Sequence, residues 1–599
     1  MKKIVNFITL VFSVCLLSVS CNEDFLEKAP GVDLTEDDIF KNQKGVENFI
    51  PTIYRYAIPS MFEYPSFHDK NLSYTRPVGE SDWVVVLPSG TMCDEGEESD
   101  IDYGAGDNWN TGDVTPQNIH RSGDNRYFAR WISLRQINTV LKRIDEVPDA
   151  DENYKKQIIG EMKVLRAINY LEMIKRYGGV PIVKEVFQPG VQIDAPRKSI
   201  EECVDFIVSE CDEAVSLLPP SYNSSQTGRV TSVVAKVIKA EALLFAASPI
   251  FNTATPYMSM PNTEDNNLIC YGNYDINRWK LAADAYREAL NLAEANGYRL
   301  IDNPANRDPK DVPGSGEPGP DGNYRYSWET NNNSEIILAF QESVQRQWRR
   351  PLNNMMPQVF GGWVAGNTVP LNFYRKYEKK DGTPQAWDMD GGDDLVAKFE
   401  ELDPRFKQTL NFTSAYYNDA HPIAEIYEGG RHYRNCFGGV WMRKYVPRAS
   451  SWQYIVLNDV IYRVNELYLG YAEALNEFAS TPPEEAYEAV NTIRNRSAMP
   501  NLPAGLTKEQ FRERLRNEKA IEMAFDDHRF FDIRRWLIAE EEGVMKGNFY
   551  GLRINKEDDG KYSWKPYIFE TRTFKKRMYL HPFPNEEVLK GNLIQNPGY

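Results

Sequence analysis

Helical periodicity over long stretches constrains the fold of this chain more than any other feature. Apolar residues recur every three to four positions over residues 127–147, 153–177 and 199–218, and two consecutive prolines close the last stretch. This pattern gives each helix one apolar face, which must be buried against a neighbouring element. The sequence therefore predicts an all-α scaffold of packed helices.

Two further regions have the signature of paired helices. From residue 279 the spacing WxxAAxxY places two alanines between large side chains. This spacing is typical of the first helix of a tetratricopeptide repeat, in which small residues let the second helix approach closely. A second pair is indicated at residues 467–477 and 484–496, joined by the segment STPP. Because the repeats keep no fixed period, we expect degenerate tetratricopeptide-like helix pairs.

Long irregular segments alternate with the helical stretches, at residues 61–126, 302–333 and 346–445. They are rich in Gly, Asn, Asp and Pro, and they carry many of the chain's 34 Tyr, 28 Phe and 12 Trp residues. Loops of this length are usually functional. Since no linker separates the scaffold from the loops, we expect a single domain with a large loop-rich face.

The first residues have the pattern of a lipoprotein export signal. A basic tip precedes an apolar stretch over residues 4–17, and small side chains lie just before Cys21. We therefore predict a signal peptide over residues 1–20, lipidation of Cys21 and one mature domain over residues 21–599. The acyl chains would be the only membrane attachment, because no interior run is long enough to span a bilayer.

Charge and motif content argue against several classes of function. The formal net charge of -17 disfavours nucleic acid, whose phosphates bind clustered Lys and Arg. No nucleophile elbow, phosphate loop or catalytic Cys–His spacing occurs, and the six His residues lack metal-ligand spacing. The five Cys residues after Cys21 are scattered and are expected to be buried thiols. We expect a binding protein with no catalytic residue and no metal site.

Two acidic loops are possible binding sites for one cofactor, Ca²⁺. They are DEGEE at residues 94–98, followed by Asp100 and Asp102, and DMDGGDD at residues 388–394. Each has enough carboxylates for Ca²⁺, although neither has the spacing of a known calcium loop. The alternative is that both are solvated acidic loops.

A denser cluster of charges lies between residues 518 and 535. It is too rich in acidic and basic side chains for an ordinary apolar helix face. We predict that some of these side chains form a buried ion-pair network between helices. The residues are Glu518, Glu522, Arg529, Asp532, Arg534 and Arg535.

Short motifs follow one another in a fixed order along the whole chain. They are RA at 166–167, YGGVP at 177–181, GRVT at 228–231, KAEA at 239–242, ASPIFN at 247–252, DPRF at 403–406, YAEALNE at 471–477, Asn491 with Arg494 and Arg496, RFFDIRRW at 529–536, and QNPGY at 595–599. In this order they resemble the SusD/RagB family of outer-membrane lipoproteins. Most of the motifs have structural roles; in YGGVP, the glycines supply the positive φ that ends a helix, and Pro181 prevents its continuation.

The resemblance implies a glycan-binding protein on the outer face of the outer membrane. Members of the family bind an oligosaccharide or polysaccharide and pass it to a SusC-like TonB-dependent transporter, without breaking a bond. One alternative is a surface adaptor of the same family that binds protein or peptide. Another is a glycoside hydrolase, which would need two carboxylates at a suitable separation.

A sugar site needs an aromatic platform for the C–H faces of the ring and a polar rim for its hydroxyls. Aromatic residues in polar loops are the candidates, because such loops cannot bury all of them. The family motifs do not assign these positions. The predicted glycan-binding residues are Trp83, Tyr103, Trp109, Tyr326, Trp328, Trp363 and Trp387.

Overall fold

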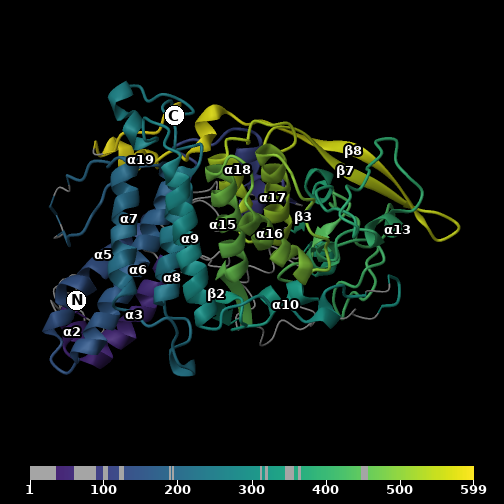
Figure 1. Ribbon diagram of the computed structural model, residues 1–599. Coiled ribbons are helices and arrows are strands. Elements are labelled where there is room, and N and C mark those ends of the chain that lie inside the picture. The colour runs from purple at the N-terminus through teal and green to yellow at the C-terminus, as the bar shows by residue number, and fades with distance from the viewer. Residues whose placement is uncertain are drawn as a thin grey trace, which may run out of the picture.

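Helices packed side by side form the larger part of this molecule (Figure 1). The computed structural model describes residues 35–59, 89–98, 106–119, 127–187, 190–191, 194–310, 313–316, 322–343, 357–361, 366–446, 456–591 and 593–599. The predicted signal peptide and Cys21 lie outside the described residues. Within those ranges, no helix is both long and apolar enough to cross a membrane.

The described α-helices range from one turn to seven turns in length. They are α2 (Glu36–Phe40), α3 (Gln43–Ala57), α4 (Gly106–Asn110), α5 (Tyr127–Arg143), α6 (Glu152–Tyr177), α7 (Ile200–Val215), α8 (Ser232–Ala247), α9 (Asn277–Ala295), α10 (Asn323–Glu329), α12 (Leu371–Tyr374), α13 (Leu395–Glu400), α14 (Arg405–Thr409), α15 (Val464–Phe478), α16 (Glu484–Arg496), α17 (Lys508–Glu522), α18 (Arg529–Arg535) and α19 (Asn585–Leu589).

Half of the described strands have only two residues. The described strands are β1 (Glu97–Glu98), β2 (Ile336–Ser343), β3 (Asn367–Thr368), β4 (Leu410–Asn411), β5 (Trp441–Met442), β6 (Val456–Arg463), β7 (Gly547–Lys556) and β8 (Tyr562–Arg572). They form one antiparallel sheet in the order β1-β3-β5-β4, and two antiparallel pairs, β2-β6 and β7-β8. The predicted all-α class is confirmed for the scaffold, since the strands of the described residues make only small sheets.

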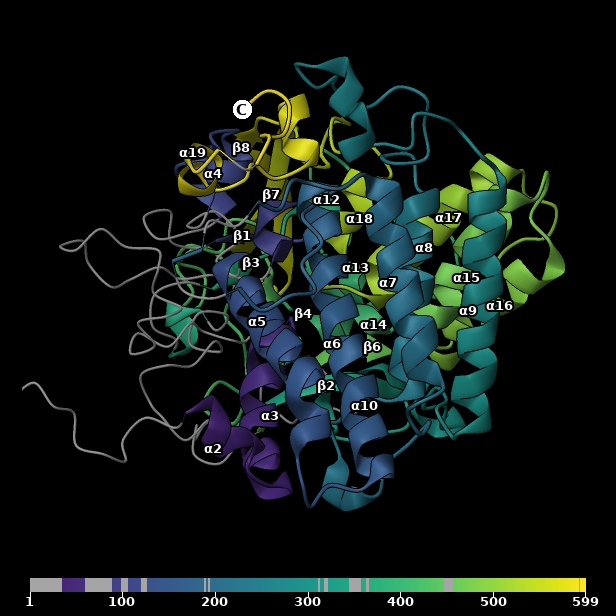
Figure 2. The same ribbon diagram turned by 90° about the vertical axis from the view of Figure 1, so that its left-hand side faces the viewer.

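The longer helices stand side by side as one layer (Figures 1 and 2). Each helix packs on the next in the order α3, α5, α6, α7, α8, α9, α15 and α16. The chain leaves the layer after α9 and returns to it only at α15. The segment between these two helices, residues 296–463, builds much of the other half of the molecule.

Local sequence signals fix where these helices begin and end. At the start of α6 the carboxylate of Asp151 accepts a hydrogen bond from the backbone N–H of Tyr154 at 2.8 Å. At its end Gly178 has a φ of 74° and donates its N–H to the carbonyl of Ile174. The neighbouring Gly179 has a different role: an added Cβ would lie 1.9 Å from the carbonyl oxygen of Lys198.

Small residues let α9 fit between α8 and α15. Ala282 and Ala283 of α9 are both buried. On α15, Gly470 lies so close to Tyr286 of α9 that an added Cβ would be 2.3 Å from ring carbon Cζ. The helix pairing expected around residue 279 is confirmed, but one partner of α9 is a helix far along the chain.

Two hydrophobic cores result from this arrangement. The larger core fills the helical layer. The smaller core is strongly aromatic and lies among α12, α13, α14 and the short strands, with rings such as Phe373, Tyr374, Phe399 and Phe406 packed together. The β7-β8 hairpin covers this second core with Leu552, and it extends beyond the helices in Figure 1.

The predicted ion-pair network joins the two halves of the molecule. Glu518 and Glu522 of α17 are buried, and Arg405 of α14 lies 2.5 Å from Glu518 and 3.1 Å from Glu522. Arg496 of α16 pairs with Glu522 as well. Because these side chains come from both halves, the network ties the aromatic core to the helical layer.

The remaining members of the predicted network lie on or near α18. Asp532 accepts from Lys519 at 3.0 Å and from Arg535 at 2.8 Å. Arg529 forms an ion pair with Asp94 at 2.9 Å. Arg534 differs, because it donates to the carbonyl of Tyr579 and lies over aromatic rings. Burial lowers the pKa of Arg534 to about 9.

The first acidic loop is not solvated, which corrects one expectation from the sequence. Asp94, Glu95, Glu97 and Glu98 are all buried, and Glu97 pairs with Arg572. Asp100 and Asp102 lie outside the described residues. In the second loop, residues 388–394 are largely exposed. Among the described residues no group of three acidic, His or Cys side chains is placed to hold a metal ion.

Candidate functional site

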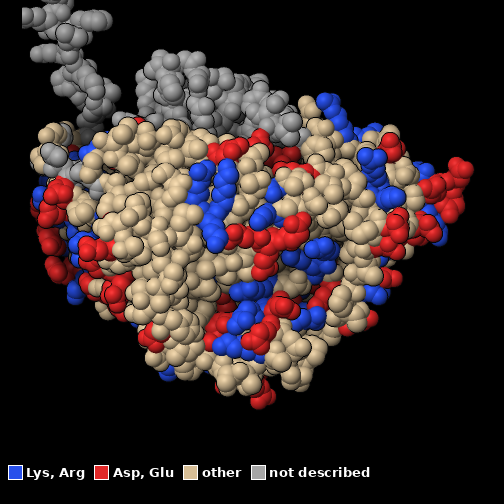
Figure 3. All heavy atoms as spheres, turned by 90° about the horizontal axis from the view of Figure 1, so that it is seen from above, with Lys and Arg blue, Asp and Glu red and all other residues tan. Residues whose placement is uncertain are grey.

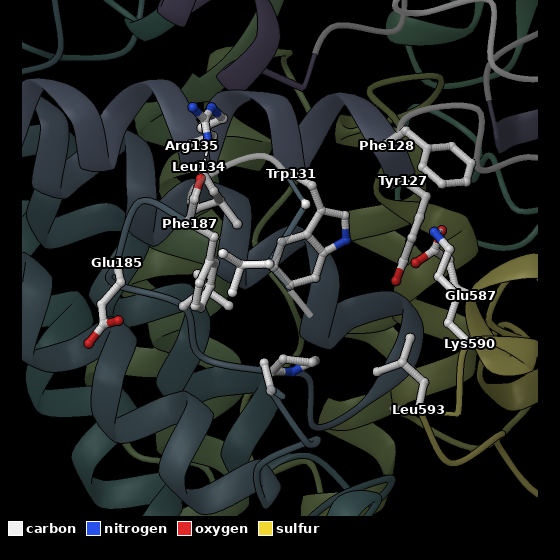
Figure 4. A pocket seen from close by; sticks show the side chains of 15 residues that line it. Tyr127, Phe128, Trp131, Leu134, Arg135, Glu185, Phe187, Glu587, Lys590 and Leu593 are labelled. Carbon is white, nitrogen blue, oxygen red and sulfur yellow. Dashed lines mark hydrogen bonds and ion pairs between the residues drawn. The ribbon is translucent and has the colours of Figure 1, made fainter. Parts of the chain in front are cut away.

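A cleft with a volume of about 540 Å³ lies where α5, the segment after α6 and the C-terminal segment meet. Figure 4 shows Trp131 projecting from α5, with Phe187 on one side of it and Tyr127 on the other. The cleft is lined by Tyr127, Phe128, Trp131, Leu134, Arg135, Pro181, Val183, Glu185, Phe187, Gly190, Val191, Ala195, Glu587, Lys590 and Leu593.

The first turns of α5 supply the aromatic side of the cleft. Tyr127 is buried, and its ring packs edge-on against Tyr177 of α6 with 5.5 Å between ring centroids. Phe128 and Trp131 lie three positions apart on the same helix and are only half-buried. The helix therefore holds two rings partly open to solvent above a buried floor.

Hydrogen bonds from α5 and α6 hold the opposite wall in place. The backbone N–H of Val183 donates to the hydroxyl of Tyr170 at 2.7 Å. Asn138 of α5 donates to the carbonyl of Val183 at 3.1 Å, and Arg135 donates to the carbonyl of Phe187 at 2.6 Å. Because this wall has no secondary structure of its own, these bonds determine where Phe187 lies.

The C-terminal segment closes the third side. Arg197 donates to the carbonyl of Ile594 at 2.8 Å, and Asn596 donates to the carbonyl of Tyr177 at 3.0 Å. Burial lowers the pKa of Arg197 to about 10, so the guanidinium stays charged at neutral pH. Next to this segment Lys590 and Glu587 form an ion pair at 2.6 Å. The end of the chain is thus fixed against the end of α6.

This arrangement suits binding of an amphipathic ligand. Aromatic faces offer stacking surfaces, and charged groups at the rim offer hydrogen bonds, which is the combination that a pyranose ring requires. The described lining holds two carboxylates, and one of them, Glu587, is paired with Lys590.

Two family models match the chain. One, for the SusD family, matches residues 334–599, and the other, described as starch-binding and associating with the outer membrane, matches residues 92–246. A SusD-like protein of Bacteroides ovatus is 20% identical over 98% of this chain and 96% of its own length. The chain belongs to the SusD/RagB family.

Solved structures of SusD-like proteins share the fold. One from Bacteroides fragilis superposes with a TM-score of 0.73 at 24% identity, over 96% of this chain and all of the other. A laminarin-binding SusD-like protein superposes with a TM-score of 0.56 at 18% identity, over 94% of this chain and all of the other. At these identities the structures show the SusD-like fold and no more.

Two of the predicted platform residues of this SusD/RagB chain are buried, so the expectation that they are exposed is wrong. Trp109 is 1% exposed and packs edge-on against Phe530 at 4.9 Å. Trp328 is 2% exposed and packs against Tyr445 at 5.5 Å. Neither ring presents a face on which a sugar could stack.

The other predicted residues fall into two groups. Trp387 is half-buried and packs edge-on between Tyr374 and Trp564, at 5.5 and 5.4 Å, so it holds its own loop in place. Tyr326 is half-buried on α10. Trp83, Tyr103 and Trp363 lie outside the described residues and stay predictions.

Sequence reasoning missed the aromatic residues of the cleft. Phe128 and Trp131 lie in a periodic helix, and aromatic residues in such a helix are usually core. Spacing alone gives no signal for them, because Phe128 and Trp131 continue the same i,i+3 row as the buried Leu134 and Ile137. What leaves the two rings half-buried is the absence of a covering segment over the first turns of α5 in the described residues.

Proposed function

We propose that this protein is a cell-surface lipoprotein that captures an oligosaccharide and delivers it, uncleaved, to a SusC-like TonB-dependent transporter. Membership of a carbohydrate-binding family that associates with the outer membrane supports the coarser part of this function. The capture site, the transporter and the lipid anchor are the finer parts that we propose.

The half-buried ring of Trp131 is the observation that carries the proposed capture site. It faces a cleft of about 540 Å³, with Phe187 opposite. In our proposal the C–H face of a pyranose stacks on Trp131, and Phe128 extends the apolar surface. Glu185, Arg135 and the Glu587–Lys590 pair lie at the rim, within the lining that its hydroxyls would meet.

Replacing Trp131 by Ala tests this site. The change removes stacking worth on the order of 1–3 kcal/mol, so we expect a roughly 5- to 150-fold loss of affinity with little change in Tm. The measurement is isothermal titration with laminarin and starch oligosaccharides, paired with thermal melting. Tyr274→Ala is the matched control, because Tyr274 is 61% exposed and does not line the cleft.

The same titration distinguishes the cleft from the loop residues predicted from the sequence. Alanine variants of Trp83, Tyr103 and Trp363 are measured beside Trp131→Ala. If one of these loses affinity while Trp131→Ala binds as tightly as the parent, the platform lies in the loops and not in the cleft.

Delivery to a transporter is tested by extraction of the native complex. Mild detergent should copurify a barrel of the SusC type with the lipoprotein. A monodisperse monomer recovered under several gentle conditions would count against the partnership, whatever the outcome of the glycan titration.

Exposed aliphatic side chains favour a second candidate function, binding of an apolar peptide. Leu589 and Ile594 near the cleft, and Val191 in its lining, are 77%, 46% and 56% exposed. A sugar has few apolar groups that could pack against such side chains, whereas a peptide can pack its own apolar side chains on them. A peptide that displaces bound oligosaccharide, or one that binds when no oligosaccharide does, would favour this candidate.

A further inference from the structure

We infer that the cleft selects uncharged glycans over glycans that carry carboxylate or sulfate groups, and that Glu185 sets this selectivity. The inference rests on the proposed function, because it concerns the ligand class of the same site. It depends on the charges that line the cleft and on how each of them is engaged.

Arg135, the only guanidinium in the described lining, already has a structural task. It donates to the carbonyl of Phe187 at 2.6 Å and so holds one wall of the cleft. Its other terminal nitrogen lies 3.8 Å from the carboxylate of Glu36. A carboxylate or sulfate on a glycan would therefore have to share this guanidinium with the carbonyl of Phe187 and the carboxylate of Glu36.

Lys590, the second cation of the lining, is paired as well. Its ammonium lies 2.6 Å from the carboxylate of Glu587, which lines the same cleft. Any anion that approached Lys590 would also approach Glu587, so the two charges largely cancel at the ligand. The pair can still exchange hydrogen bonds with hydroxyl groups.

Glu185 is the one charge of the described lining without a partner of opposite sign. Its side chain is exposed at the edge of the cleft, where Figure 4 shows its carboxylate apart from the other labelled charges. Two cations and two anions line the cleft, and Glu36 beside Arg135 adds a third anion, so an anionic ligand would meet more negative than positive groups. An uncharged glycan would instead find an acceptor for its hydroxyls.

The charge of the chain as a whole acts in the same direction. The chain has a formal net charge of -17. On the face seen in Figure 3, the Lys and Arg side chains of the described part lie among Asp and Glu side chains. Long-range attraction of a polyanion needs the opposite, a continuous basic surface.

The test uses the full-length lipoprotein in detergent micelles and a panel of six-residue oligosaccharides. Maltohexaose, laminarihexaose and xylohexaose are uncharged, and hexagalacturonate and hexaguluronate carry a carboxylate on each ring. Affinities are measured by titration for the parent, Glu185→Lys and Glu485→Lys. Glu485 is exposed on α16, outside the cleft lining, and gives the same change of charge as a control.

We expect the tightest ligand of the parent to be uncharged. Glu185→Lys should raise the affinity for the uronates by about tenfold at low salt, an effect that 1 M NaCl removes because the Debye length falls to about 3 Å. Glu485→Lys should leave every affinity unchanged.

Each other outcome overturns a separate statement. A uronate that binds the parent more tightly than every uncharged oligosaccharide overturns the inference and leaves the proposed function intact. Equal behaviour of Glu185→Lys and Glu485→Lys overturns the role of Glu185. If no oligosaccharide binds the parent, the proposed function fails, and the inference fails with it.

Discussion

At the scale of single residues, Asp94 and Glu95 are both buried, but the pKa of Asp94 is lowered and the pKa of Glu95 is raised. Asp94 is fully buried and paired with Arg529, whose charge helps to hold the pKa of Asp94 below its usual value despite the opposing effect of burial. Glu95 is also buried, and Phe525 donates its N–H to one carboxylate oxygen at 3.2 Å. The other oxygen has no hydrogen-bond partner, and burial, together with the charge of Asp94, raises the pKa of Glu95 well above 4.5.

This contrast predicts opposite effects of two similar substitutions. Because Glu95 holds its proton more tightly when folded, its contribution to the free energy of unfolding falls as pH rises above about 4.5. The Gln side chain of Glu95→Gln is neutral at every pH. At pH 7.5 the variant should have a free energy of unfolding about 1–3 kcal/mol higher than the parent, and therefore a higher Tm, whereas at pH 4 its Tm should be unchanged. Thermal melting at both pH values is the measurement.

Asp94→Asn makes the same kind of change, from carboxylate to amide, at the neighbouring position. It leaves Arg529 buried without its partner, which should cost about 3–5 kcal/mol at pH 7.5. The stabilising effect of Asp94 is present above about pH 3.8 and is lost as pH falls through its lowered pKa. If both variants shift Tm in the same direction at pH 7.5, the assignment of the two environments is wrong.

The aromatic residues show how far the sequence alone can predict a site. Composition correctly indicates that polar segments hold large rings, yet Trp109 and Trp328 are buried by Phe530 and Tyr445, which are far away along the chain. Trp131 is the opposite case: its helical pattern predicts burial, whereas its side chain is only half-buried in the structure. Exposure depends on which distant segment covers a ring, and local sequence does not specify that.

At the scale of elements, the contact between α9 and α15 depends on a residue without a side chain. A Cβ at Gly470 would overlap the buried ring of Tyr286. We expect Gly470→Ala to lower the free energy of unfolding by about 1–3 kcal/mol, the usual cost of overpacking a core. Chemical denaturation is the measurement.

A double variant provides the control for this prediction. Tyr286→Leu removes the ring atoms that an added Cβ would meet, so Gly470→Ala should cost much less in that background. If the cost is the same in both backgrounds, the loss comes from backbone effects and not from the contact with Tyr286.

Helices were predictable from the sequence and strands were not. The periodic stretch at residues 153–177 corresponds to α6, Glu152–Tyr177, because capping and glycine signals mark both of its ends. The sheet of β1, β3, β4 and β5 consists of strands of two residues, and so short a strand carries no alternation of polar and apolar side chains. The strands that pair in this sheet are also distant from one another in the sequence, so no turn between them indicates the pairing.

At the scale of the whole molecule, the proposed anchor predicts where the protein resides in a cell. Cys21→Ala removes the thiol that would carry the lipid, so the protein should leave the outer-membrane fraction. Cys15→Ala, within the predicted signal peptide, is the matched control and should change nothing. Metabolic labelling with a radioactive fatty acid and membrane fractionation are the measurements, and a labelled, membrane-bound Cys21→Ala variant would disprove the anchor.

The return of the chain to the helical layer at α15 also sets the order of events during folding. In a chain exported through the proposed signal peptide, Tyr286 cannot be covered until the segment as far as Gly470 has also crossed the membrane. During that time α9 exposes an apolar face, and the intervening segment must find its own core before the layer can close. The helical layer can therefore close only after the intervening segment is in place, and until then the exported chain exposes apolar surface that favours aggregation.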